Sequence, residues 1–162
     1  MRLTNFILLT VLTMATLNAQ SSPQSNQHFS HTENTNASPS SIWNVWTDVT
    51  RWKDWDTGLK DAYMDDAFML GAKGTIISLE GRKSRFTITE FVEGQSYTMK
   101  TKLPLGSLYV KRYLKVDEQT TTFTHEVWFK GLTKGVFAKA FGGKFRAMLP
   151  DVLENIKQIV EE

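Results

Sequence analysis

Residues 38–56 read SPSSIWNVWTDVTRWKDWD, and this stretch decides how the chain begins to fold. Ser38 followed by Pro39 is the pattern of a helix N-cap with proline in the first turn, so we expect a helix to about Asp48. Clustered tryptophans at helical spacing are typical of a buried core, although they also suit a stacking site. The apolar positions continue onto a short second helix or turn that ends at Gly58: Ile42, Trp46, Val49, Trp52 and Trp55.

Strand-like segments separated by short turns make up most of the remaining chain. We expect strands at 28–37, 59–68, 72–80, 84–92, 96–103, 107–116 and 121–130. Four of the turns are short enough to join antiparallel neighbours, which predicts a meander: 80–83, 92–95, 103–106 and 117–120. In the last segment, TTFTHEVWF, inward and outward residues alternate, so one face of the sheet should be buried.

The tail from about Thr133 to Glu161 is expected to be helical, because its apolar residues fall at steps of three and four. Gly142, Gly143 and Pro150 interrupt this pattern, so we expect a bent helix with a mobile middle. The apolar stripe consists of Phe137, Phe141, Phe145, Met148, Val152, Ile156 and Ile159.

The N-terminus has the pattern of a secretory signal peptide over residues 1–19. Arg2 precedes an uncharged apolar stretch at 6–17, shorter than the roughly 20 residues that span a bilayer, and Ala19 is a small residue for cleavage. An uncleaved N-terminal anchor is the alternative. Cleavage would leave a polar flexible linker at 20–27 and a domain at 28–162, exported to the periplasm or secreted, without a transmembrane segment.

Composition excludes several classes of function. The net charge is only +2 and no run of Lys or Arg occurs, so nucleic acid is not expected as a partner. The absence of Cys excludes disulfides, thiolate catalysis and thiolate metal sites. His28 and His31 would face opposite sides of a strand, so no metal site is expected, and no motif indicates a cofactor. The sequence leaves the oligomeric state open.

The order of these elements, together with several motifs, resembles a known family. The stretch 38–56 is similar to the first-helix signature of the START-like (SRPBCC) superfamily, whose fold is the helix-grip fold. The resemblance covers about 28–162 and implies an α+β fold: a seven-stranded curved antiparallel sheet around a long C-terminal helix, with two short helices after the first strand and a deep apolar cavity. Four further segments resemble the polyketide cyclase/dehydrase branch: FTITEFVEGQSYT (86–98), LYVKRYLKV (108–116), FTHEVWFKG (123–131) and Leu149-Pro150.

Polar residues interrupt the apolar rows that should face the concave side of the sheet. Alternation along three strands places Glu90, Arg112 and His125 on this face. Counting back from the last short turn sets Arg112 opposite His125. Tyr97 and Met99, on the strand between, should face the same way, with Glu90 within reach of Arg112.

Two interpretations of this cluster stay open. In the structural one, Glu90 and Arg112 form a buried pair and His125 is satisfied beside them. In the functional one, the cluster is the polar floor of an apolar pocket and holds a carboxylate, hydroxyl or carbonyl of a ligand. The pocket wall would then include Phe137, Phe141 and Phe145.

The favoured function is the binding or transport of a small hydrophobic or lipid-like molecule, without catalysis. The alternative is an enzyme similar to polyketide cyclases and dehydratases, in which His125 moves a proton and Arg112 stabilises an enolate or carboxylate. In the related branch a His often stands at the Arg112 position. Because Arg keeps its proton near neutral pH, His125 is then the one candidate acid or base. An interaction module with a vestigial cavity ranks last, since export would separate it from cytosolic partners.

Overall fold

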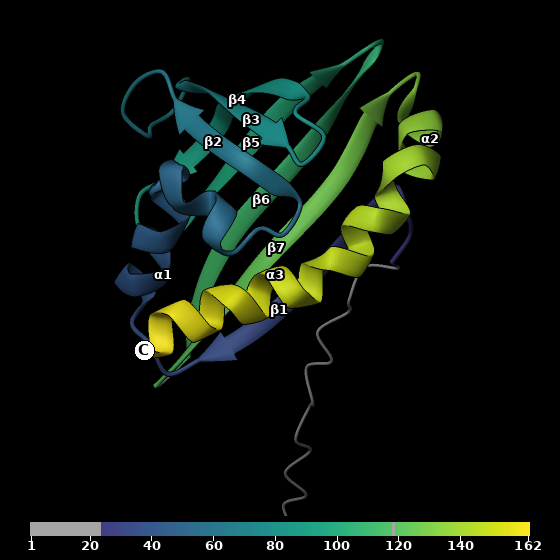
Figure 1. Cartoon of the computed structure of the whole chain (residues 1–162). Helices are drawn as coiled ribbons and strands as arrows, with labels where there is room; N and C mark the ends of the chain where they lie inside the picture. Colours follow the sequence, from purple (N-terminus) through teal and green to yellow (C-terminus); the bar gives the residue numbers. More distant parts are fainter. Residues whose placement is uncertain (1–23, 118) are drawn as a thin grey trace, which may run out of the picture.

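The protein is built on an antiparallel sheet whose strands lie in the order β1-β7-β6-β5-β4-β3-β2 (Figure 1). The structure is a computed structural model and describes residues 24–117 and 119–162; the predicted signal peptide at 1–19 lies outside them. The predicted meander is confirmed. The first strand, β1, pairs with the last strand, β7, and forms one edge of the sheet. The strands are β1 (His28–Thr35), β2 (Leu59–Met64), β3 (Lys73–Ser78), β4 (Lys83–Val92), β5 (Ser96–Leu103), β6 (Gly106–Asp117) and β7 (Thr120–Gly131).

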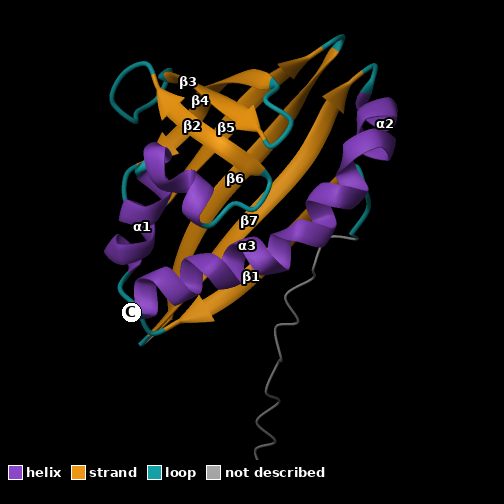
Figure 2. Ribbon diagram, in the orientation of Figure 1, coloured by secondary structure: helices purple, strands orange, loops and turns teal. Residues whose placement is uncertain are grey.

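Two short helices connect β1 to β2, as the opening stretch predicts. α1 (Pro39–Thr47) begins after Ser38, whose side chain accepts a hydrogen bond from the Ser41 backbone N–H at 3.2 Å. A 3-10 helix, η1 (Val49–Asp54), follows directly. Both helices cover one end of the concave face of the sheet (Figure 2).

The C-terminal helix crosses the concave face, and its axis changes direction along its length (Figure 1). It comprises α2 (Lys134–Phe137), a π-helical turn η2 (Ala138–Gly142) and α3 (Gly143–Glu161). The predicted bend is therefore present, but α3 continues through Pro150 without a break. The irregularity lies instead at η2, next to the glycine pair.

The glycine at position 142 is explained by a close approach of the N-terminal segment. A Cβ on Gly142 would lie 2.0 Å from the carbonyl oxygen of Asn26, so only glycine lets the two backbones pass. Residues 24–27, part of the predicted linker, are tied to the sheet here. The Phe129 N–H bonds to the Gln27 carbonyl at 3.0 Å, and Gln24 bonds to Ser30.

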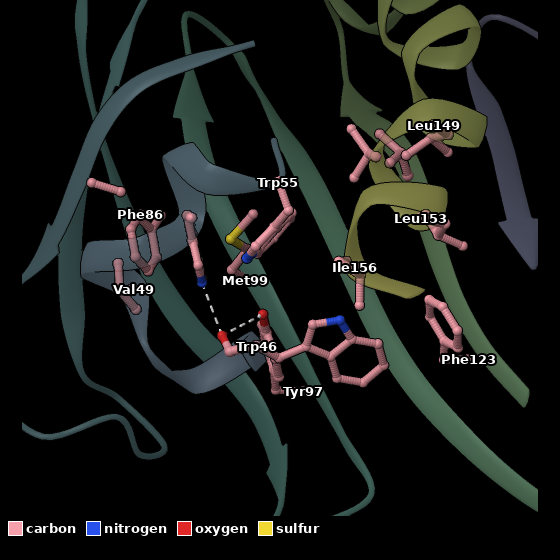
Figure 3. Close-up of a cluster of buried hydrophobic side chains, with 14 of the residues drawn as sticks. Trp46, Val49, Trp55, Phe86, Tyr97, Met99, Phe123, Leu149, Leu153 and Ile156 are labelled. Carbon is pink, nitrogen blue, oxygen red and sulfur yellow. Dashed lines mark hydrogen bonds between the residues drawn. The ribbon is translucent and has the colours of Figure 1, made fainter. Parts of the chain in front are cut away.

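The core lies between the sheet and the helices (Figure 3). Its largest fully buried members come from the first helices, the strands and α3: Trp46, Trp52, Trp55, Tyr97, Phe29, Phe86, Phe123, Ile42, Ile88, Leu153 and Ile156. The core packing predicted for the tryptophans is therefore confirmed for Trp46, Trp52 and Trp55, while Trp43 is partly buried. Among the described residues no helix is long and apolar enough to span a membrane.

Candidate functional site

Arg112 and His125 lie side by side on the concave face of the sheet. They are partners in the β6–β7 ladder, as predicted from the short turn between these strands. Arg112 is only 2% exposed and His125 only 1%. Burial lowers the pKa of His125 well below its usual value, and Arg112 and His31 lower this pKa further. His125 is therefore a neutral imidazole next to a permanent cation at neutral pH.

Neighbouring strands extend this pair into a row of four polar side chains at one level of the sheet. Tyr97 is the ladder partner of Arg112 on β5, and His31 is the partner of His125 on β1. Arg112 Nη1 donates to the Tyr97 hydroxyl. This hydroxyl in turn donates to the Trp46 carbonyl at 3.4 Å (Figure 3). Burial raises the pKa of Tyr97, against the opposing effect of Arg112, so the hydroxyl stays protonated.

The charge of Arg112 is surrounded by aromatic rings. Its Cζ lies 4.6 Å from the ring centroid of Trp52, 4.7 Å from that of Trp55 and 5.6 Å from that of Tyr97. Such contacts attract a cation to the electron-rich faces of the rings. No described carboxylate lies within 4.0 Å of the guanidinium.

Asp56 is the acidic group that interacts with Arg112 from a greater distance. Burial raises the pKa of the Asp56 carboxyl, while Arg112 and the Gly58 N–H, bonded at 3.0 Å, act against this rise. Asp56 follows η1 directly, at the end of the opening stretch. No local sequence pattern pairs it with a residue on β6.

Several buried nitrogen atoms around this row have no hydrogen-bond partner among the described residues. They are Arg112 Nε, His125 Nε2, Trp46 Nε1 and Trp55 Nε1. The rings of Trp46 and Trp55 lie 5.6 and 6.0 Å from that of His125, centroid to centroid, so the residues that carry these atoms are neighbours. Buried polar groups are nearly always bonded, so these nitrogen atoms are the polar groups of the site that lack a hydrogen-bond partner within the described part of the chain.

The predicted inward position of Glu90 is wrong. A β-bulge between Ile88 and Glu90 inserts one extra residue into β4 and reverses the alternation beyond it. The Glu90 side chain is 63% exposed on the convex face, where its carboxylate accepts from Thr98 at 2.6 Å and lies 3.6 Å from Lys111 Nζ. The buried Glu90–Arg112 pair therefore does not form.

The other predicted pocket residues are found in two places. Met99 is buried on the concave face, next to Tyr97 in the pattern of β5. The three phenylalanines of the C-terminal helix are half-buried and stacked, with centroids 6.2 and 6.3 Å apart: Phe137, Phe141 and Phe145. They form an apolar wall near the other end of the sheet from α1.

The deep apolar cavity implied by the resemblance is filled beside Arg112. Trp46, Trp52, Trp55 and Tyr97 occupy this space and are each at most 1% exposed. A surface cleft of about 160 Å³ lies close by, between α1, η1 and the end of α3. Trp55 is among the residues that line this cleft, and its ring also lies against the guanidinium of Arg112.

Four members of this site are not predicted from the sequence to lie near Arg112 and His125. They are His31, Asp56, Trp52 and Trp55. The alternation of β1 is enough to place His31 inward, but its pairing with His125 depends on β1 joining β7 at the end of the meander.

Comparison with protein families and solved structures gives a consistent result. The family model described as "Polyketide cyclase / dehydrase and lipid transport" matches residues 26–161. A search of curated proteins gave no match. A hypothetical protein from Helicobacter pylori is 12% identical with a TM-score of 0.68, covering 91% of this chain and 99% of its own.

Two further solved structures share the fold. A protein from Arthrobacter aurescens is 17% identical with a TM-score of 0.64, covering 89% of this chain and 92% of its own. Norcoclaurine synthase from Thalictrum flavum, solved with dopamine and hydroxybenzaldehyde, is 12% identical with a TM-score of 0.63, covering 83% and 86%. At these identities the likeness concerns the fold alone.

Proposed function

The chain belongs to the polyketide cyclase/dehydrase and lipid transport family, and we propose that it binds a small, largely apolar molecule whose acidic or carbonyl oxygen is received by Arg112. The observation that carries this proposal is the buried guanidinium, which has no described carboxylate within 4.0 Å and an unpartnered Nε, with Asp56 interacting only from a greater distance.

The energetics of a buried cation support a ligand at this position. Removing a guanidinium from water costs several kcal/mol unless a counter-charge or hydrogen bonds compensate. Contacts with aromatic rings return about 0.5–2 kcal/mol each, and the hydroxyl of Tyr97 accepts one further bond. A ligand oxygen at Nε would supply the missing acceptor.

The surrounding groups also restrict the chemistry of the ligand. Arg112 Nε and the two indole nitrogens can only donate, so together they suit an oxygen acceptor such as a carboxylate, an enolate or a carbonyl. The rings of Trp46, Trp52 and Trp55 suit an apolar or aromatic body. We place the access route at the surface cleft, where a rotation of Trp55 would connect it to Arg112.

A matched pair of fluorescent probes tests this proposal: cis-parinaric acid and its methyl ester. Arg112→Met should weaken binding of the acid by about 10- to 100-fold, the worth of a charge-assisted hydrogen bond, and should change binding of the ester less. Lys111→Met is the matched control, because it removes a neighbouring charge from the opposite face of β6. Equal losses for acid and ester, or the same loss in Lys111→Met, would contradict the proposal.

The natural ligand can be sought directly. Native mass spectrometry of the protein purified from its own source, followed by organic extraction, should show a retained apolar acid or ketone. The Arg112→Met protein, prepared in the same way, should lack it. A compound retained equally by both proteins would show that Arg112 does not hold it.

A second function is favoured by one observation, the neutral His125 beside Arg112. We propose as the alternative a proton-transfer reaction of the cyclase or dehydratase type. His125 would take a proton next to a ketone, and Arg112 would stabilise the enolate. The protein should then speed deuterium incorporation into the methyl group of 2-acetylnaphthalene in D2O, and His125→Gln should not. Equal rates of deuterium incorporation with the protein and with His125→Gln would contradict the enzymatic alternative.

We further propose that the chain is exported and cleaved after Ala19, on the basis of the signal pattern at 1–19. N-terminal sequencing of the protein from its own source should begin at Gln20. A sequence that begins at Met1 or Arg2 would instead identify an uncleaved anchor.

A further inference from the structure

One end of the sheet carries an exposed apolar and basic surface that the proposed site does not use. We call this surface the tip and define it as residues 102–106, the β5–β6 turn, and 130–139, the β7–α2 turn with the start of the helix (Figure 2). The two turns are joined: the Leu132 N–H bonds to the Leu105 carbonyl at 3.0 Å, and Thr133 Oγ1 donates to the Pro104 carbonyl at 2.6 Å.

Three large apolar side chains project from the tip. Leu105 is 73% exposed, Leu132 88% and Val136 69%. Leu105 also has a φ of 54°, in the left-handed region that favours glycine. A leucine at such a position gains nothing for the fold from its side chain, because that side chain is in water. Exposure and backbone strain together indicate a role outside the fold.

The charges around these side chains have one sign. The tip contains four exposed lysines and no acidic residue: Lys102, Lys130, Lys134 and Lys139. The sequence from 94 to 116 and from 127 to 150 has no Asp or Glu at all, although the chain as a whole is near neutral. The carboxylate of Glu90, which belongs to another element, interacts with Lys130 of the tip.

We propose that the tip docks onto an anionic lipid bilayer. Apolar side chains at the apex can enter the acyl boundary, while lysines behind them meet lipid phosphates. Trp128 and Tyr109, stacked 5.2 Å apart with Lys130 above them, lie three residues from the turns, about 10 Å back along the strands. At this distance from the turns the two rings would lie at the interface between lipid and water, the position that Trp and Tyr favour.

A bilayer explains these features better than another macromolecule. A nucleic acid would use the lysines but leave the projecting leucines without a partner. An acidic protein would need a matching apolar pocket, for which nothing in this chain gives evidence. The docking also does not depend on the ligand site, because Arg112 lies on the buried concave face and the tip is at the end of the sheet.

Vesicle co-sedimentation of the full chain tests the docking. Vesicles of phosphatidylcholine with 30% phosphatidylglycerol should bind the protein at least tenfold more tightly than phosphatidylcholine alone, and 0.5 M NaCl should remove most of the difference. Lys134→Gln with Lys139→Gln should weaken binding to anionic vesicles by about 30-fold, from about fivefold per lysine. Leu105→Ser with Leu132→Ser should weaken it by at least tenfold.

The control lies at the opposite end of the β6–β7 hairpin. Lys115→Gln with Val116→Ser removes an exposed lysine and an apolar side chain that is 60% exposed there, and it should leave binding unchanged. The apolar residues 6–17 are present in every variant, so differences among variants report the tip. Equal binding by tip and control variants would overturn the proposal, as would equal binding to neutral and anionic vesicles.

Leu105→Gly separates folding from docking. Glycine relieves the backbone strain at φ 54°, so the thermal unfolding midpoint should stay the same or rise. Vesicle binding should nevertheless fall severalfold, because one apolar side chain is lost. A variant that binds vesicles as the parent does would show that Leu105 does not enter the bilayer.

Discussion

The neutral, buried state of His125 predicts how stability changes with pH. In the unfolded chain this histidine gains a proton near pH 6.5. In the folded protein, burial, Arg112 and His31 hold its pKa well below that value. Above pH 6.5 the histidine is neutral in both states, so it does not make the free energy of unfolding depend on pH. As the pH falls below 6.5, only the unfolded state gains the proton, so the folded state loses stability.

The size of this loss follows from the number of protons. One proton bound only by the unfolded state costs about 1.4 kcal/mol per pH unit, so the loss reaches about 2 kcal/mol at pH 5 when the folded protein keeps His125 neutral. Other groups also titrate. The raised pKa of Asp56 acts in the opposite direction, because the folded state then gains its proton first as the pH falls. A comparison of two proteins cancels such contributions.

Urea unfolding followed by tryptophan fluorescence measures this comparison. Between pH 7.5 and 5.0 the wild type should lose about 2 kcal/mol more than His125→Gln. His28→Gln is the control, since His28 lies on the convex face bonded to Glu126 at 2.6 Å and its loss leaves His125 in place. If the difference in the free energy of unfolding between wild type and His125→Gln stays constant over this pH range, His125 is not a buried imidazole that stays neutral in the folded protein.

Three further substitutions have defined outcomes. Gly142→Ala should lower the free energy of unfolding by about 1–3 kcal/mol in urea denaturation, because its Cβ would collide with the Asn26 carbonyl; Gly135→Ala, with open space around it, should cost nothing. Arg112→Met should change the free energy of unfolding by less than about 1 kcal/mol or raise it, whereas a loss above about 3 kcal/mol would identify a structural cation. Glu90→Gln should change the free energy of unfolding by at most about 0.5 kcal/mol and leave cis-parinaric acid binding unchanged. A large effect on either would contradict the exposed position of Glu90.

Much of the fold was predictable from the sequence because its signals are local. The N-cap at Ser38 and the period-two alternation of β7 depend on residues a few positions apart. The pairing of Arg112 with His125 was also predictable, since a short turn fixes the register of the two strands it joins. The bulge before Glu90 had a weak signal: the apolar spacing from Ile88 to Phe91 is three residues rather than two.

The site and the tip were decided by the tertiary structure. The sequence determined by itself the order of the elements, the buried face of β7, and the pairing of Arg112 with His125. Only the fold placed Trp55 and Asp56 near Arg112 and His31 next to His125, because these contacts join elements far apart in the chain. The same holds for the tip, whose lysines form no run in the sequence. Two turns about 30 residues apart become one surface because β6 begins beside the end of β7, and no local sequence pattern predicts this contact.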